Sequence, residues 1–137
     1  MKEHKLFVIA SLLLSSAWAT TLEDALASDF ADCYNPSGTC SCDGIDLSGT
    51  ELTGTIPAAL GSCSALTHLY LQSNSLSGTV PASLGNLSAL TYLRLNSNSF
   101  TGTVPAWLGS LSALTYLALG DNSLTGTVRM APGVGRE

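Results

Sequence analysis

The sequence predicts a right-handed solenoid of the α/β repeat class, because it repeats itself every 24 residues. Segments 63–86, 87–110 and 111–134 align without a gap, and segment 39–62 aligns in its second half. A single repeat cannot bury its apolar face alone and must stack on copies of itself. We therefore expect short parallel strands on a concave face and irregular or 3₁₀ segments on the convex side.

Within the copy at 87–110, the apolar spacing changes from three to two only around residues 92–96. A period of two is that of a strand, so Leu93 and Leu95 should point inward. The asparagine after each strand should bond backbone groups that the bending chain leaves unpaired. Glycine then permits a tight backbone, and proline starts the segment that returns to the next strand. These columns are Asn74, Asn98 and Asn122; Gly78, Gly102 and Gly126; and Pro57, Pro81 and Pro105.

The repeat LxxLxxLxLxxNxLxGT[VI]PxxLGx closely resembles the plant-type leucine-rich repeat, and LxGTVP is its most specific part. The resemblance covers roughly residues 44–128, or about four coils. It implies a leucine-rich repeat solenoid whose concave face commonly takes the ligand. The same resemblance leaves two kinds of protein open. The chain is either a small secreted protein similar to the polygalacturonase-inhibiting proteins or an N-terminal fragment of a membrane receptor-like ectodomain.

Residues 1–19 have the layout of a secretory signal peptide. Lys2 and Lys5 precede an apolar run at 6–14, and Ala17-Trp18-Ala19 forms a small-residue cleavage site. The run is shorter than the roughly 20 residues of a membrane span, although an uncleaved anchor is the alternative. No later segment is long and apolar enough to span a bilayer. We expect a secreted or extracellular protein, held at the cell surface if the chain is part of a receptor.

Residues 20–43 are expected to cap the first coil, since nothing else covers its apolar face. Leu22, Ala25, Leu26 and Phe30 recur at helical spacing within 20–31, which predicts an amphipathic helix. The segment resembles the cysteine-bearing N-terminal cap of plant-type leucine-rich repeat proteins. It departs from that cap in lacking the usual tryptophan between its cysteines.

Cysteines cluster at this end of the chain. An even number in a chain with a signal peptide favours two disulfides, for which three pairings are open. Cys42 aligns with Leu66 and Cys63 with Leu87, so a bridge between adjacent coils is the expectation and a reduced core thiol the alternative. The disulfide candidates are Cys33, Cys40, Cys42 and Cys63.

The C-terminal end, residues 129–137, departs from the repeat. Arg129 stands where other copies have proline, and the tail has no apolar pattern able to cover the last coil. An uncapped coil would expose apolar side chains and favour association. We expect self-association through this coil, or else a truncated chain or faulty gene model. The side chains concerned are Leu111, Leu114, Leu117, Leu119 and Leu124.

Outward-pointing residues of the predicted strands form columns on the concave face. The first column is Gly44, His68, Tyr92 and Tyr116; the second is Asp46, Tyr70, Arg94 and Ala118; the third is Ser48, Gln72, Asn96 and Gly120. Tyrosine, histidine and arginine are typical of interaction hot spots. The alternative is that tyrosine occurs here only because of its high strand propensity. The predicted ligand-binding residues are His68, Tyr70, Gln72, Tyr92, Arg94, Asn96 and Tyr116, with an extracellular protein, peptide or glycan as partner.

Charge and composition argue against other classes of function. The chain has a formal net charge of −5, which repels nucleic acid and anionic lipid. Beyond the predicted signal peptide it has a single histidine, no lysine, and no nucleophile elbow, phosphate loop or metal-spaced ligand pair. We expect no catalysis, no cofactor and no metal.

A ladder of hydroxyl residues suggests a further alternative, ice binding. Thr53-Gly54-Thr55 recurs as Ser77-Gly78-Thr79, Thr101-Gly102-Thr103 and Thr125-Gly126-Thr127. If these segments form a second strand in each coil, the hydroxyls lie roughly 6.5–7 Å apart along it and about 5 Å from the next coil. Such an array is similar to the threonine ladders of ice-binding solenoids, although a hydroxyl beside this glycine is ordinary in plant-type repeats.

Asn86-Leu87-Ser88 is an acceptor sequence for N-linked glycosylation, with a permitted middle residue. The other candidate, Asn35-Pro36-Ser37, is excluded by its proline. Asn86 is therefore the predicted glycosylation site.

Overall fold

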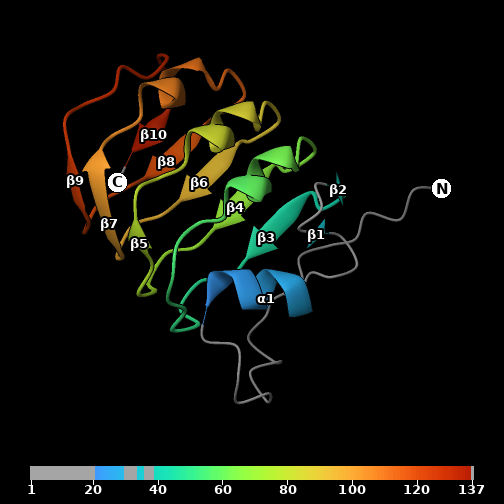
Figure 1. Ribbon diagram of the computed structural model, residues 1–137. Helices are drawn as coiled ribbons and strands as arrows, with labels where there is room; N and C mark the ends of the chain where they lie inside the picture. Colours follow the sequence, from blue (N-terminus) through green and yellow to red (C-terminus); the bar gives the residue numbers. More distant parts are fainter. Residues whose placement is uncertain (1–20, 30–33, 36–38, 137) are drawn as a thin grey trace.

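The computed structural model describes residues 21–29, 34–35 and 39–136. This part of the chain winds through coils stacked in one direction (Figure 1). The stack runs from α1 (Leu22–Asp29) at one end to β9 (Ser123–Thr125) and β10 (Gly135–Arg136) at the other. The predicted repeat solenoid with 3₁₀ segments is confirmed.

The main sheet is parallel and five-stranded, in the order β10-β8-β6-β4-β3. From β3 to β8 the register is one full repeat, so that Leu69 pairs with Leu93, and Leu93 with Leu117. Equivalent residues of successive copies therefore stand side by side, and we call the solvent side of this sheet the concave face. The strands are β3 (Gly44–Asp46), β4 (His68–Tyr70), β6 (Tyr92–Arg94), β8 (Tyr116–Ala118) and β10.

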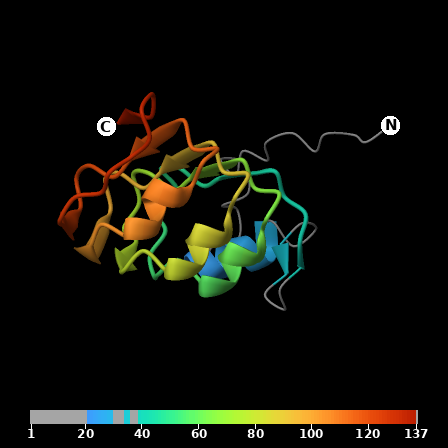
Figure 2. The ribbon, with the colours of Figure 1, turned by 90° about the horizontal axis from the view of Figure 1, so that it is seen from above.

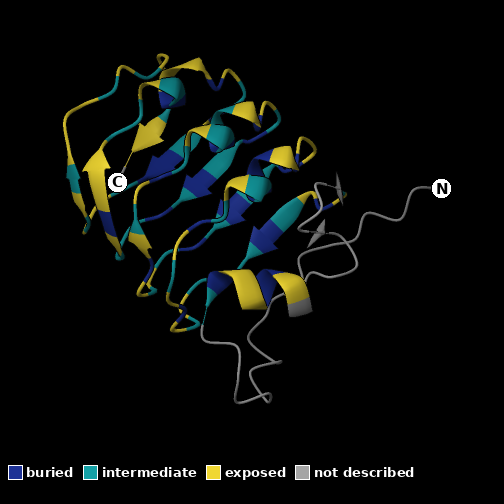
Figure 3. Ribbon diagram, in the orientation of Figure 1, coloured by how far each residue is buried: buried dark blue, intermediate teal, exposed yellow. Residues whose placement is uncertain are grey.

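Strand β6 is shorter than the predicted 92–96 because the chain turns soon after Arg94. Ser97 has a φ of 56°, in the left-handed region. The inward direction of Leu93 and Leu95 is as expected, since both are fully buried. Figure 3 shows buried and half-buried residues along β3, β4, β6 and β8, whereas β10 is exposed.

Three 3₁₀ helices form a row on the side of the molecule away from the main sheet (Figure 2). A proline precedes each helix, with φ of −68°, −68° and −67° and extended ψ. Because the proline ring fixes φ near this value, it sets the direction in which each return segment begins. The helices are η2 (Ala58–Ser62), η3 (Ala82–Asn86) and η4 (Ala106–Ser110).

The Thr-Gly-Thr segments contribute to a second parallel sheet, with the order β5-β7-β9. Its strands are β5 (Ser77–Gly78), β7 (Ser99–Thr103) and β9. Gly78 and Gly102 have φ of 77° and 87°. A Cβ on Gly78 would lie 3.0 Å from the Thr55 methyl, and one on Gly102 would lie 3.1 Å from the Thr79 methyl. Glycine thus meets both a backbone and a packing requirement here.

The asparagine column joins neighbouring coils, as predicted. The side-chain oxygen of Asn98 accepts a hydrogen bond from the Leu76 N–H at 3.0 Å. Its amide nitrogen donates to the carbonyl oxygens of Leu71 at 2.8 Å and Leu95 at 3.2 Å. Asn74 and Asn122 repeat this arrangement one coil away on either side. One side chain therefore satisfies backbone groups of two coils.

Helix α1 closes the N-terminal end of the core. Leu22, Ala25 and Leu26 are buried, at the spacing that the sequence indicates. Thr21 caps the helix, because its hydroxyl oxygen accepts from the Asp24 N–H at 3.1 Å and its hydroxyl donates to the Asp24 carboxylate at 2.6 Å. Phe30 and residues 1–20, with the predicted signal peptide, lie outside the described residues.

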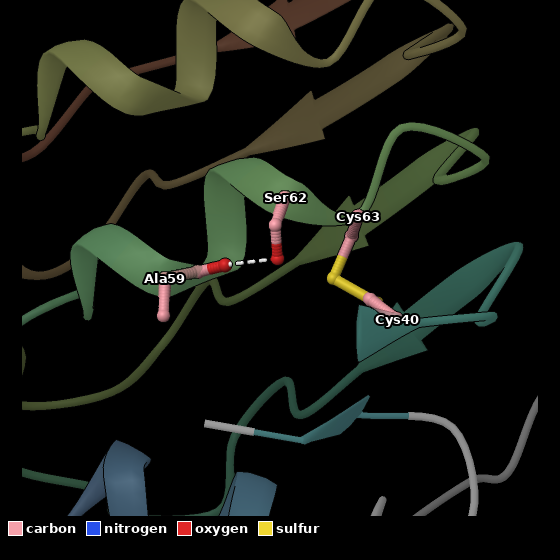
Figure 4. The surroundings of a disulfide bond; sticks show 4 residues. All are labelled: Cys40, Ala59, Ser62 and Cys63. Atoms are coloured by element: carbon pink, nitrogen blue, oxygen red, sulfur yellow. Dashed lines mark hydrogen bonds between the residues drawn. A yellow bond between two sulfur atoms is a disulfide. The ribbon is translucent and has the colours of Figure 1, made fainter. Parts of the chain in front are cut away.

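A disulfide ties this cap to the second repeat copy. Cys40, in β2 (Thr39–Cys40), is bonded to Cys63, with 4.7 Å between their Cα atoms (Figure 4). Strand β2 pairs antiparallel with β1 (Tyr34–Asn35). Cys42 is also disulfide-bonded, and Cys33 lies outside the described residues. Disulfide formation is confirmed for Cys63, but its partner is Cys40 and not the other core-aligned cysteine, Cys42. The alternative of a reduced core thiol does not hold for Cys63.

The expectation of an uncapped C-terminal coil is wrong for most of its leucines. Strand β10 pairs with β8, and the Gly135 N–H donates to the Thr115 carbonyl at 2.8 Å. Met130 and Val134 pack against the core. Strand pairing uses backbone groups, so it needs no apolar pattern in the tail. Exposure falls to 5 %, 4 % and 4 % at Leu111, Leu114 and Leu117, whereas Leu119 and Leu124 are half-buried.

A cavity of about 200 Å³ remains beside the tail. Its lining is mainly apolar and comprises Val104, Leu117, Leu119, Thr127, Val128, Met130 and Arg136. Self-association at this end stays a prediction, as do the domain boundaries. Within the described ranges, no helix has the length and apolar character needed to cross a membrane.

Replacing Asn98 with alanine should destabilise the protein by about 2–4 kcal/mol, because it leaves buried backbone groups of two coils without partners. Asn96→Ala is the matched control, since within the described residues the only side-chain hydrogen bond of Asn96 is a 3.5 Å contact to Ser97. It should change stability by no more than about 0.5 kcal/mol. Urea denaturation compares the two, and equal midpoints would contradict the structural role of Asn98.

Candidate ligand-binding face

The register of the main sheet brings the predicted binding residues together. His68 pairs with Tyr92 and Tyr92 with Tyr116, while Tyr70 pairs with Arg94. Each of these side chains is half-buried, so each packs against its neighbours and still exposes part of its surface to solvent. Ala118, also in an outward column, is buried. The sheet thus places one ring or guanidinium group beside another across three strands.

The rings of the first column lie one after another along the stack. His68 and Tyr92 are stacked, with 4.9 Å between ring centroids and 8° between planes. Tyr92 and Tyr116 follow at 6.0 Å and 31°. Tyr70 meets His68 and Tyr92 edge to face, at 5.8 and 6.5 Å. Such aromatic pairs each add roughly 0.5–1.5 kcal/mol, so the cluster is held in place before any ligand arrives.

Arg94 lies between two of these rings. Its guanidinium carbon is 5.2 Å from the centroid of Tyr70 and 4.9 Å from that of Tyr116, within range of cation–π attraction. The Nε of Arg94 is buried and has no hydrogen-bond partner among the described residues. The rings thus hold the positively charged guanidinium group in place, and its Nε–H donor is left without an acceptor.

His68 is oriented by hydrogen bonds from the neighbouring loop. The Thr67 hydroxyl lies 2.6 Å from the Asp43 carbonyl and 2.7 Å from Nδ1 of His68. Because a hydroxyl has one proton, and the carbonyl can only accept, Nδ1 of His68 must be the donor to Thr67. The neutral ring therefore carries its proton on Nδ1, which leaves Nε2 as an acceptor.

The third column is less connected. Gln72 and Asn96 are half-buried and stand outside the network of ring and guanidinium contacts. The Oε1 of Gln72 is buried without a hydrogen-bond partner in the described part of the chain. The structure therefore joins five of the predicted residues into one cluster, which we call the tyrosine–arginine cluster: His68, Tyr70, Tyr92, Arg94 and Tyr116.

A column of left-handed residues borders this face, and the sequence prediction lacks it. Gly49, Ser73, Ser97 and Asp121 have φ of 63°, 58°, 56° and 52°. Gly49, in the first copy, is the one sequence signal for this column, because glycine adopts the left-handed conformation without strain. Non-glycine residues there carry a cost of order 1 kcal/mol each, which the surrounding coil must offset.

The hydroxyl ladder follows the second sheet and has two distinct columns, of which the exposed one has only Thr103 within a described strand. Ser77, Thr101 and Thr125 donate to carbonyl oxygens of the preceding coil at 3.4, 3.5 and 3.2 Å. The other column is exposed, and its hydroxyls make no hydrogen bond among the described residues. Its members are Thr55, Thr79, Thr103 and Thr127.

Comparisons with known proteins place the chain in a class. A family model described as leucine rich repeat matches residues 43–100, so this segment consists of leucine-rich repeats. The leucine-rich repeat ectodomain of the plant membrane receptor kinase GASSHO1/SCHENGEN3 from Arabidopsis thaliana, in complex with CASPARIAN STRIP INTEGRITY FACTOR 2, is 40% identical with a TM-score of 0.59. The match covers 61% of this chain and 10% of that one.

Two further solved structures are similar. PEPR1–AtPEP1 is 43% identical over 69% of this chain and 14% of that one, with a TM-score of 0.64. A plant ice-binding protein is 34% identical over 61% of this chain and 27% of that one, with a TM-score of 0.59. No curated protein sequence matches the chain. The repeats match the plant-type leucine-rich repeat of these relatives, and the chain spans only a small part of their length.

Arg94→Ala should raise the pKa of Tyr70. Burial already raises this pKa above the ordinary value, the Arg94 charge lowers it, and Tyr92 and Asp46 raise it. A raised pKa means that the contribution of Tyr70 to stability is complete below about pH 10 and is lost as pH rises through the folded-state pKa. Ultraviolet titration of tyrosinate in the variant should show later ionisation of Tyr70. Arg129→Ala, which removes an exposed arginine elsewhere, is the control, and earlier ionisation in the Arg94 variant would contradict the geometry.

Proposed function

We propose that this chain is an extracellular, non-catalytic recognition module that binds a protein or peptide through its concave face. The observation that carries the proposal is the tyrosine–arginine cluster, in which three strands hold four rings, two of them in contact with one guanidinium group. Tyrosine and arginine dominate interaction hot spots because they combine large contact area with polar ends. Here they are preorganised, which lowers the entropy lost on binding.

The geometry favours an acidic protein segment over a glycan. Tyr92 has His68 near one side of its ring and Tyr116 near the other, at 4.9 and 6.0 Å. Its faces are thus largely taken, and a ligand meets its edge and hydroxyl rather than a flat surface for a sugar. Ring edges carry partial positive charge, and Arg94 adds a full one. Carboxylates and backbone carbonyls suit this surface.

The relatives support this proposal at the level of class. One is the ectodomain of a membrane receptor kinase in complex with CASPARIAN STRIP INTEGRITY FACTOR 2. The Cys40–Cys63 disulfide fits an oxidising, extracellular location. The proposal is the same for a secreted module and for part of a receptor ectodomain, because the face is built within residues 68–116 in either case.

Peptide selection tests the proposal directly. A random peptide library selected on the immobilised protein should yield sequences rich in aspartate and glutamate, whose amide-substituted forms bind more weakly. The double variant Tyr92→Ala, Arg94→Ala should bind the selected peptides about 30-fold more weakly, a loss of about 2 kcal/mol. Isothermal calorimetry provides the affinities.

Arg129→Ala is the matched control, since it removes one positive charge away from the cluster. It should leave affinity unchanged within about twofold, as expected for a charge outside the contact area. If the Tyr92 and Arg94 double variant bound the selected peptides as tightly as the unmodified protein does, the proposal would be wrong.

Ice binding is a second candidate function, favoured by the paired second sheet. Hydrogen-bonded strands lie about 4.8 Å apart, and the pairing of β5, β7 and β9 brings neighbouring segments of the hydroxyl ladder to that distance. The register of this sheet is 22 residues, so Thr103 lies opposite Thr125 rather than Thr127. The exposed column at Thr55, Thr79, Thr103 and Thr127 has hydroxyls that are available to water. The similar plant ice-binding protein is consistent with this candidate.

Microscopy of single ice crystals tests this candidate. If it holds, the protein shapes growing crystals, and Thr79→Tyr with Thr103→Tyr abolishes the shaping because bulky rings break the array. The Tyr92 and Arg94 double variant should keep the activity, since its changes lie on the other sheet. Ice crystals that grow unshaped in the unmodified protein would rule the candidate out.

A further inference from the structure

The side chain of Asn86 has no structural task in its coil. It is the last residue of η3, where the equivalent positions in η2 and η4 are Ser62 and Ser110. Those two hydroxyls donate to the carbonyl oxygens of Ala59 and Trp107, both at 2.7 Å (Figure 4 for Ser62). The Asn86 side chain is exposed and makes no such bond within the described residues. The position thus departs from its own repeat column.

The chain following Asn86 presents the acceptor tripeptide outward. Leu87 has φ −78° and ψ 66°, the values of an inverse γ-turn. This turn is closed by the Ser88 N–H, which donates to the Asn86 carbonyl at 2.9 Å. Leu87 is fully buried, whereas Asn86 and Ser88 are exposed. The core anchors the middle residue and leaves both residues that the acceptor sequence requires in solvent.

The location keeps this tripeptide away from the other surfaces discussed above. Asn86 ends a helix of the 3₁₀ row, on the opposite side from the main sheet (Figure 2). The tyrosine–arginine cluster lies on that sheet, and the exposed hydroxyl column lies on the second one. A bulky group on Asn86 would therefore leave both surfaces open.

We propose that Asn86 carries an N-linked oligosaccharide. In the transfer, the side-chain nitrogen of Asn86 bonds to the anomeric carbon of an oligosaccharide carried on a lipid diphosphate. The bond from that carbon to the diphosphate oxygen breaks, the lipid diphosphate leaves with the electron pair, and the asparagine nitrogen loses one proton. The glycan covers the convex side and leaves the concave face free.

The full chain, secreted from a eukaryotic host, tests the site. Its mobility on a denaturing gel should increase after treatment with an amidase specific for N-linked glycans. Asn86→Gln and Ser88→Ala should each remove the amidase-sensitive shift, and Ser88→Thr should keep it, because threonine also completes the acceptor sequence. No shift in the unmodified protein, or a shift that persists in Asn86→Gln, would overturn the proposal.

A second arm moves the site within the repeat. Ser110-Leu111-Ser112 is the equivalent tripeptide at the end of η4, so Ser110→Asn creates the same acceptor sequence one coil later. In the double variant Asn86→Gln, Ser110→Asn, the glycan should return. A secreted, folded double variant without a glycan would contradict the claim that the end of the 3₁₀ helix presents the acceptor.

Discussion

The whole structure depends on one constraint: a 24-residue coil has an apolar face that only another coil can cover. Leucines at fixed positions meet this constraint, because equivalent residues pair across the main sheet. The asparagine column makes the register specific, since each side chain bonds backbone groups of its own coil and of the coil before it. Apolar burial thus drives stacking, and hydrogen bonding decides how the coils align.

The stacking of similar coils also creates the functional surfaces. Because each coil repeats the last, a residue type at one position becomes a column on the surface, and three columns are distinct in character. Rings and one arginine lie on the main sheet, hydroxyls lie on the second sheet, and the 3₁₀ row carries an asparagine in place of serine. The ligand proposal, the ice-binding candidate and the glycan proposal therefore concern separate faces of one scaffold.

Much of this could be predicted from the sequence, because a repeat shows the same physical requirement several times. The inward leucines, the asparagine role and the membership of the outward columns follow from spacing alone. Two kinds of feature do not. The pairing of β10 with β8 uses backbone groups and leaves no side-chain pattern, and the position of Arg94 between Tyr70 and Tyr116 depends on side-chain conformations. Cys40 was one of several candidates, since spacing did not select its partner.

Native-state hydrogen exchange of the unmodified protein tests the central claim most directly. If neighbouring coils stabilise one another, the amides of β4 and β6, with coils on both sides, should exchange most slowly. Those of β10, with one described neighbour and two residues, should exchange much faster, and protection should change in steps from coil to coil. Equal protection in β6 and β10, or faster exchange in the central strands, would contradict the account.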